Sequence, residues 1–200
     1  YMCGITCWNY FSESLSKTSN TFTSNANIFG KVYFPRLIVP ISIIISNIVK
    51  FVIQGFIFLL VLSYYYFSGA QVTPNITIAV LPILLLLMAG LGLGFGILIS
   101  SLTTKYRDFQ FLVVFGVQLF MYATPIVYPL SLAKEKLGTF AWIAFANPMS
   151  SIVEAMKYAF LGQGQFSWPH LAYSFTFMII LLTIGIITFN KVEQNFMDTV

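Results

Sequence analysis

Apolar residues along this chain form five long stretches, and short segments rich in charges, prolines or small polar residues separate them. Each stretch is close to the roughly twenty residues that a helix needs to cross a bilayer. A helix suits such a stretch because lipid offers the backbone no hydrogen-bond partner. The pattern therefore predicts five membrane-spanning helices. Their approximate bounds are 1–23, 38–62, 76–101, 109–128 and 169–189.

The composition agrees with this pattern. The 200 residues are 58% hydrophobic and only 8% charged, whereas soluble domains are roughly 25% charged, and the mean hydropathy is +0.85. We therefore expect an all-α integral membrane protein, a helical bundle that forms a single transmembrane domain over 1–200. The net charge of +4 does not indicate nucleic-acid binding, because the basic residues stand singly near the ends of the stretches.

The first stretch begins without a charged segment or a cleavage signal before Tyr1. We therefore expect the natural N-terminus, with one or more spans, to be missing. Cys3 and Cys7 lie four residues apart in this stretch, and the chain holds one histidine. This pattern favours two small apolar helix residues over a disulfide or a metal site.

The orientation in the membrane follows from the connecting segments. Alternation of the spans places the turns 24–40 and 101–108 and the C-terminal tail on one face. The basic residues there are Lys31, Arg36, Lys105, Arg107 and Lys191. The opposite face, which also holds Glu135 and Glu154, has Lys134, Lys136 and Lys157. Because cytoplasmic loops carry the excess of basic residues, this modest difference predicts that the first face is cytoplasmic.

The fourth stretch ends with Pro125 and Pro129, which remove backbone donors and kink or end a helix. The following region, 130–165, is too interrupted to span a bilayer and too apolar for a free loop. We expect a pair of re-entrant helices on the outer face, which dip into the membrane and meet near Asn147 and Pro148.

Three charged residues fall inside the predicted spans. Glu13 and Lys17 are one helical turn apart, in the order that favours an ion pair. Lys50 lies deep in the second span, where a lysine is costly unless it is paired or hydrated. We therefore expect the first span to face water or a polar ligand, and Lys50 to pair with Glu13. The alternative is a shorter first helix that leaves Glu13 and Lys17 near the membrane surface.

Two further patterns lie within the spans. Gly90, Gly92, Gly94 and Gly96 form two small-xxx-small pairs, which favour close helix packing over a flexible hinge. Aromatic residues are frequent, and sugars stack on aromatic rings, so such residues suit a saccharide path, although aromatic side chains also face lipid. In the first span these residues include Trp8, Tyr10 and Phe11.

The turn before the fourth span carries Lys105, Arg107 and Asp108. These charges fit a hydrated membrane anchor or a contact surface for a cytoplasmic partner, and both interpretations stay open. The sequence shows no catalytic cluster and no phosphate-binding loop. We therefore do not expect the chain to be an enzyme or to hydrolyse ATP.

Four segments together resemble the permease subunit of ABC-type polysaccharide exporters, which move O-antigen, teichoic acid or capsular glycans. They are "SNANIFGKVYFPRLIVPIS", "KYRDFQFLVVFGVQLFMYATPIVYP", "FANPMSSIVEAMKYAFLG" and "FNKVEQNFMDTV". Their order and spacing agree over essentially the whole chain. Such permeases usually have six spans after an amphipathic helix, so this chain resembles one without that helix and the first span.

The resemblance implies a homodimer in the bacterial cytoplasmic membrane, bound to two copies of a cytoplasmic ABC ATPase that holds ATP and magnesium; the chain itself would bind no cofactor. The substrate would be a lipid-linked polysaccharide. The segment 24–37 would be the coupling helix, so the residues at the ATPase would be Lys31, Tyr33, Phe34, Pro35, Arg36, Lys105, Tyr106, Arg107 and Asp108. The conduit would be lined by Trp8, Tyr10, Phe11, Glu13, Lys17 and Lys50. The outer gate would hold Pro125, Tyr128, Pro129, Asn147 and Pro148.

Three other functions remain open. An ABC export permease for drugs or haem would share the architecture and differ in cargo. A secondary transporter would use Glu13, Lys17 and Lys50 for ion coupling. A membrane-embedded glycan-modifying enzyme is the third.

Overall fold

The computed structural model describes residues 1–25, 35–69, 73–106, 108–128, 130, 138 and 141–197. Every regular element within these ranges is a helix, which confirms the all-α prediction. In chain order the helices are α1 (Met2–Ser19), α2 (Thr21–Ser24), α4 (Ile38–Phe67), the 3-10 helix η1 (Ile76–Val80), α5 (Leu81–Lys105), α6 (Phe109–Ala123), α8 (Ala141–Ala146), α9 (Pro148–Leu161) and α10 (Trp168–Met197).

Three helices within the described ranges are long and apolar enough to cross a membrane: Ile38–Phe67, Ile76–Thr104 and Trp168–Val192. They coincide with the second, third and fifth predicted spans. The first predicted span corresponds to α1, which is 18 residues long and amphipathic. The fourth corresponds to α6, an apolar helix of 15 residues. The total of five spans stays a prediction.

Helix α6 ends five residues before the predicted end of the fourth span. Thr124 has an extended backbone (φ −91°, ψ 134°), as expected for a residue that precedes a proline. Pro125 therefore stops the helix locally, and the chain turns away from the α6 axis.

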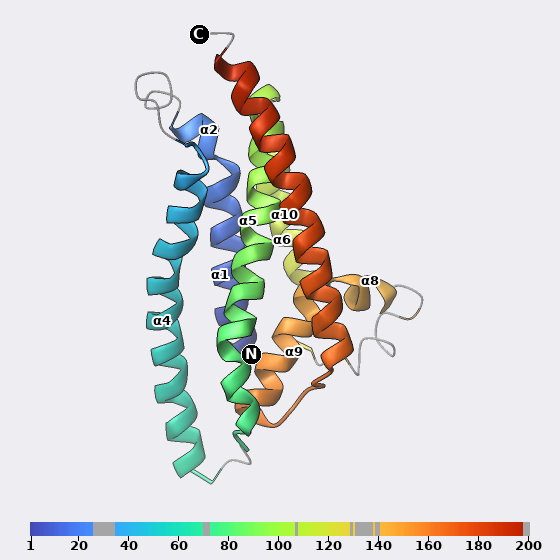
Figure 1. The fold of residues 1–200 in the computed structure, drawn as a ribbon. Coiled ribbons are helices and arrows are strands. Elements are labelled where there is room, and N and C mark those ends of the chain that lie inside the picture. The colour runs from blue at the N-terminus through green and yellow to red at the C-terminus, as the bar shows by residue number, and fades with distance from the viewer. Residues whose placement is uncertain are drawn as a thin grey trace.

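Helix α5 lies at the centre of the bundle, with α1 and α10 packed against it and α4 on the outside next to α1 (Figure 1). Gly96 faces α1, and a Cβ atom there would lie 2.4 Å from Cβ of Thr18. Gly90 faces α10, and a Cβ atom there would lie 2.2 Å from Sδ of Met178. Because the Cβ atom of Thr18 is fixed to the backbone of α1, a larger residue at position 96 would require the two helices to shift, whereas the flexible side chain of Met178 could move away from a larger residue at position 90. The predicted role in close helix packing is thus confirmed for Gly96.

Different helix ends and connecting segments lie at the two ends of the bundle. Helix α2, the start of α4, the C-terminal end of α5 and the C-terminal end of α10 lie at one end (Figure 1). The C-terminal end of α4, η1 and α9 lie toward the other. This arrangement matches the predicted alternation of the connecting segments. We name the two ends the coupling end and the gate end, after the roles that the sequence predicts for them.

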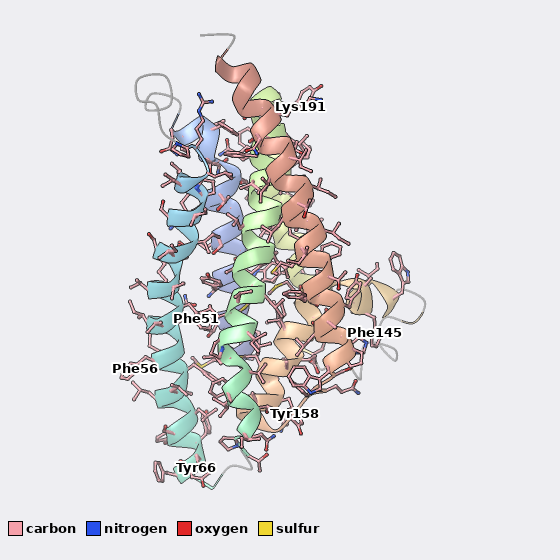
Figure 2. The ribbon with its side chains drawn as sticks, in the orientation of Figure 1. Phe51, Phe56, Tyr66, Phe145, Tyr158 and Lys191 are labelled. Carbon is pink, nitrogen blue, oxygen red and sulfur yellow. The ribbon has the colours of Figure 1, made fainter. Side chains whose placement is uncertain are left out.

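Helix α4 exposes apolar side chains on the side away from the bundle. Phe51 points toward α1, whereas Phe56 points outward (Figure 2), and their exposed fractions are 7% and 62%. Ile45 and Val49 are also exposed. An apolar outer surface of this kind suits contact with lipid, since lipid chains accept apolar side chains without cost.

Candidate functional site: a polar stripe beside a groove

Helix α1 exposes polar side chains along most of its length, whereas α4 exposes apolar ones. From Asn9 onward, every residue of α1 and its C-cap that keeps accessible surface is polar. These residues define the polar stripe: Asn9, Ser12, Glu13, Ser16, Lys17 and Asn20. Their spacing of three or four residues places them on one face of the helix. The opposite face of α1 is packed into the core.

The charged residues of the stripe form an ion cluster with α4. Nζ of Lys17 lies 2.8 Å from Oε1 of Glu13, and Nζ of Lys50 on α4 binds the same oxygen. The side chains of Glu13, Lys17 and Lys50 are 30%, 47% and 54% exposed. We call these three residues the open cluster. The expected pairing of Lys50 with Glu13 is thus confirmed.

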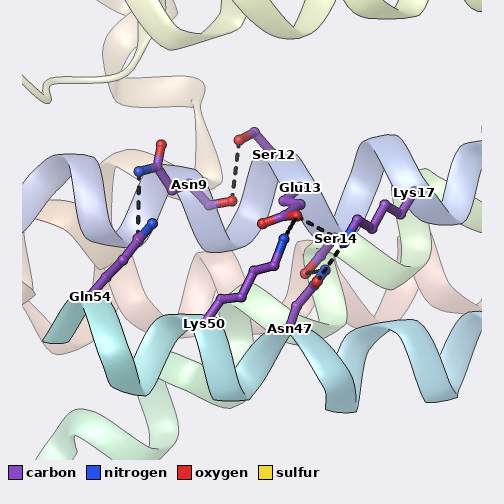
Figure 3. Close-up of polar contacts among 8 residues, drawn as sticks. All are labelled: Asn9, Ser12, Glu13, Ser14, Lys17, Asn47, Lys50 and Gln54. Carbon is purple, nitrogen blue, oxygen red and sulfur yellow. Dashed lines mark hydrogen bonds and ion pairs between the residues drawn. The ribbon is translucent and has the colours of Figure 1, made fainter. Parts of the chain in front are cut away.

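Further hydrogen bonds to amide and hydroxyl side chains anchor this cluster between the two helices (Figure 3). Lys17 donates to Oδ1 of Asn47 at 3.4 Å, and Nδ2 of Asn47 donates to Oγ of Ser14 at 3.2 Å. Two turns further along α4 from Asn47, Asn9 donates to Gln54 at 3.5 Å. Asn47 is buried, so the cluster has an enclosed base and an accessible outer side.

A groove of about 360 Å³ runs between α1 and α6, on the other side of Glu13. Its lining mixes hydroxyl, amide and carboxylate groups with apolar side chains: Trp8, Ser12, Glu13, Ser16, Val114, Val117, Gln118 and Met121. A second, apolar cleft of about 410 Å³ lies between α5 and α6, and Val117 belongs to the walls of both. A polar and an apolar hollow thus adjoin each other along α6.

The aromatic residues predicted to line a conduit lie mainly on the packed side of α1. Tyr10 donates to the carbonyl of Ile44 at 3.4 Å, and its ring lies 5.4 Å from that of Phe51. Phe11 is fully buried. Trp8 is also buried, although it forms part of the groove wall. From Asn9 onward, the accessible surface of α1 is therefore polar rather than aromatic. Phe11 falls on the helix face opposite the stripe, whereas Tyr10 lies at the edge of the stripe and is covered by α4.

The residues predicted for the outer gate come together where α6 ends and α9 begins. Asn147 separates α8 from α9, and its Oδ1 accepts from the backbone N–H of Met149 at 2.9 Å. Its Nδ2 donates to Oγ1 of Thr124 at 2.8 Å. Asn147 thus caps α9 and ties it to the end of α6. The insertion of α8 and α9 into the membrane stays a prediction, and Pro129 lies outside the described residues.

Two charged residues that the sequence analysis did not select hold this junction. Lys157 on α9 donates to the backbone carbonyls of Pro125 and Tyr128, the latter at 3.2 Å, and to Oε1 of Glu154 at 3.2 Å. Glu154 also accepts from the backbone N–H groups of Leu130 and Gln165, at 3.4 and 3.3 Å. We call Glu154 and Lys157 the buried pair. Their position inside the apolar "SSIVEAMKYAF" was the signal that could have found them.

The predicted coupling residues are only partly described. Lys31, Tyr33, Phe34 and Arg107 lie outside the described residues, and the side chain of Lys105 at the end of α5 is also not described. Pro35 is exposed and Arg36 is buried just before α4, while Tyr106 and Asp108 are exposed between α5 and α6. The described residues Pro35, Arg36, Tyr106 and Asp108 adjoin helix ends at the coupling end. The contact of the predicted coupling residues with an ATPase stays a prediction.

Both cysteines are buried free thiols, with no disulfide between them. Within the described ranges, no group of three histidine, cysteine, aspartate or glutamate side chains could hold a metal ion.

Comparison with known proteins agrees with this arrangement. Two proteins of Klebsiella pneumoniae, each named O-antigen export system permease protein RfbA, are 26% identical to the chain over 196 and 200 residues, which is 98% of this chain and 72% of each relative. A protein of the same name from Myxococcus xanthus is 26% identical over 157 residues, or 78% of this chain and 58% of that protein. The family of ABC-2 type transporters matches residues 1–161. The chain therefore belongs to the ABC-2 type transporter family, as its resemblance to ABC permeases predicted.

Proposed function

We propose that the chain is the permease subunit of an ATP-driven exporter, which moves a lipid-linked polysaccharide across the bacterial cytoplasmic membrane. Two copies would form the channel and two ATPase subunits would bind beneath them, with ATP and magnesium on those partners. The names of the relatives, which describe O-antigen export permeases, support this cargo.

The polar stripe of α1 carries this proposal. The accessible charged side chains of Glu13 and Lys17 cannot face lipid without a large cost, and the serine and asparagine side chains beside them are also polar, so this face requires water or a polar ligand. The hydroxyl and amide groups of Ser12, Ser16 and Gln118 can exchange hydrogen bonds with a hydroxyl-rich chain. The stripe and the groove would therefore line the path of the glycan.

The two ends of the bundle would have separate roles. At the coupling end, Lys31, Tyr33, Phe34, Pro35 and Arg36, together with Lys105–Asp108, would receive the motion of the ATPase. At the gate end, Pro125, Tyr128, Pro129, Asn147 and Pro148 would open or close the exit. The hydrogen bonds of Asn147 to Thr124 and Met149 support a defined junction there, which a gate requires.

Glycan export in cells that lack the chromosomal gene tests the proposal. The full-length protein should restore surface polysaccharide, and Ser16→Leu should abolish this export because it places an apolar side chain in the stripe. Ser42→Leu is the matched control, since Ser42 is exposed on the outer side of α4. Equal export by both variants would contradict a path along the stripe.

The energy source needs its own test in inverted membrane vesicles. Uptake of lipid-linked glycan into the vesicles should require ATP and should continue when the proton gradient is collapsed. The tagged permease should also co-purify with an ATPase subunit. Transport that follows the proton gradient without ATP would favour an ion-coupled transporter instead.

A further inference from the structure

The open cluster holds an excess of positive charge. The single carboxylate of Glu13 pairs with two ammonium groups, those of Lys17 and Lys50. Of the other acidic side chains in the described part of the chain, Glu154 is bound by Lys157, and Asp108 lies beyond the end of α5. The cluster therefore carries one net positive charge from the residues that form it.

This charge lies far from either end of α4. Lys50 follows Ile38, the first residue of α4, by twelve positions, which is about 18 Å at 1.5 Å per residue. Ile45, Val49 and Phe56, on the same helix, expose apolar surface suited to lipid. An ammonium group at that depth is costly unless an anion or water accompanies it, and Glu13 can neutralise only one of the two.

The cluster also has hydrogen-bond donors to spare. Each ammonium group has three donors. The bonds described here use two donors of Lys17, to Glu13 and Asn47, and one of Lys50, to Glu13. Both side chains are about half exposed, and Glu13 also belongs to the wall of the groove. The groove wall contains Glu13 but neither lysine, so an anion would reach the free donors of both lysines from their exposed side, next to the groove, without loss of their existing bonds.

We propose that the open cluster binds an anionic group of the exported molecule, so that the cargo carries a carboxylate or phosphate that passes Lys17 and Lys50. This inference rests on the proposed function and specifies its substrate class. Glu13 holds the two ammonium groups together and prevents their mutual repulsion. Ser12, Ser16 and Gln118 serve the neutral hydroxyl groups of the same molecule. The anion can belong to the sugar residues or to the lipid carrier, because both present the same oxygens.

Binding to the full-length protein with its ATPase partner, in nanodiscs of neutral lipid, tests this inference. The first arm compares trigalacturonate with maltotriose, which have equal length and differ in charge. The second arm compares phosphatidic acid with diacylglycerol and tests for a lipid phosphate. We expect a preference of about tenfold for the charged member of at least one pair, and this preference should fall at high salt.

Two variants assign the preference to the cluster. Lys17→Gln and Lys50→Gln each remove the excess charge and leave Glu13 paired with the remaining lysine, so a folding defect in one variant leaves the other usable. Each should reduce the preference to about twofold or less. Lys191→Gln, which removes an exposed charge near the C-terminal end of α10, should leave it unchanged.

Equal affinity for charged and neutral molecules in both arms would overturn the inference, and so would the absence of binding by any of them. A preference that persists in both lysine variants would overturn it as well. ATP-driven export of a glycan shown to be neutral, on a carrier without phosphate, would reject the anion site but leave the proposed export function intact.

Discussion

Among the described residues, two groups of paired charged side chains lie within the helices, and they differ in almost every physical respect. The open cluster joins α1 to α4, has two bases for one acid, and is partly accessible. The buried pair lies within α9, has one base for one acid, and its side chains are 11% and 2% exposed for Lys157 and Glu154. The open cluster bonds mainly to side chains, whereas the buried pair bonds to four backbone groups.

This difference indicates two functions for charge in one membrane protein. The buried pair compensates itself and satisfies backbone groups that the break at Pro125 leaves without helical partners. Its loss should therefore affect the fold. The open cluster is unbalanced and accessible, so its loss should affect binding more than folding. Substitutions in each group test this distinction.

Lys157→Met should have the largest effect on stability. The substitution leaves the Glu154 carboxylate buried without its cation and leaves the carbonyls of Pro125 and Tyr128 without a donor. Removal of one partner from a buried ion pair costs about 3–5 kcal/mol. We expect a large fall in the melting temperature of the detergent-solubilised protein, measured by size-exclusion chromatography after heating.

A second substitution tests whether the pair itself causes this loss. Glu154→Gln combined with Lys157→Met removes the uncompensated charge, so the double variant should be more stable than Lys157→Met alone. Lys191→Met is the control for loss of an exposed lysine and should leave the melting temperature nearly unchanged. A double variant less stable than the single one would show that the backbone bonds outweigh the ion pair.

Asn147→Ala should have the next largest effect. It removes the cap of α9 and leaves Oγ1 of Thr124 without its donor in a buried position. Loss of a cap and of a buried hydrogen bond together cost about 2 kcal/mol. Asn147→Ser retains a capping oxygen but is too short to replace the bond to Thr124. Its melting temperature should lie between those of the wild type and Asn147→Ala, and equality with Asn147→Ala would argue against the cap.

Asn47→Ala tests the enclosed base of the open cluster and should have a smaller effect. Asn47 is buried and links Lys17 to Ser14. Loss of the buried neutral bond to Ser14 costs about 1 kcal/mol, whereas water can replace Asn47 as the acceptor at the half-exposed ammonium group of Lys17. Asn9→Ala, which removes only the 3.5 Å bond to Gln54, should cost less in the same thermal assay. If Asn47→Ala matched Lys157→Met in effect, the open cluster would be structural as well.

Much of the fold could be predicted from hydrophobic pattern alone. The spans at 38–62, 76–101 and 169–189 correspond to α4, η1 with α5, and α10, because long apolar runs have few alternatives in lipid. The fourth span was predicted to end at residue 128, whereas α6 ends at Ala123. Pro125 could have indicated this earlier end, because a residue that precedes a proline disfavours the helical conformation. The break at Asn147 was predicted from the same kind of local signal.

The contacts of the candidate site could be predicted only where helical spacing, or the energetic cost of a charge inside the membrane, determined them. The Glu13–Lys17 pair follows from helical spacing, and the Lys50–Glu13 pair from the cost of a deep lysine. Helical spacing could also have placed Phe11 opposite the polar stripe, whereas the burial of Tyr10 depends on its packing against α4. The bonds from Lys157 to Pro125 and Tyr128 depend on how α9 packs under the end of α6, and local sequence does not determine that packing.

Lys17→Gln should have the smallest effect on stability and a strong effect on transport. Its side chain is 47% exposed, and Glu13 keeps Lys50 as a partner when Lys17 is replaced. Exposed ion pairs contribute about 0.2–1 kcal/mol, so the melting temperature should stay close to that of the wild type. ATP-driven glycan export should nevertheless fall several-fold, because the cluster loses its excess charge beside the groove. Lys191→Gln, measured in parallel, should retain both properties.

If Lys17→Gln lowered the melting temperature as much as Lys157→Met while export per folded molecule stayed normal, the two groups of charges would have the same structural function. The contrast between a binding cluster and a structural pair would then be wrong.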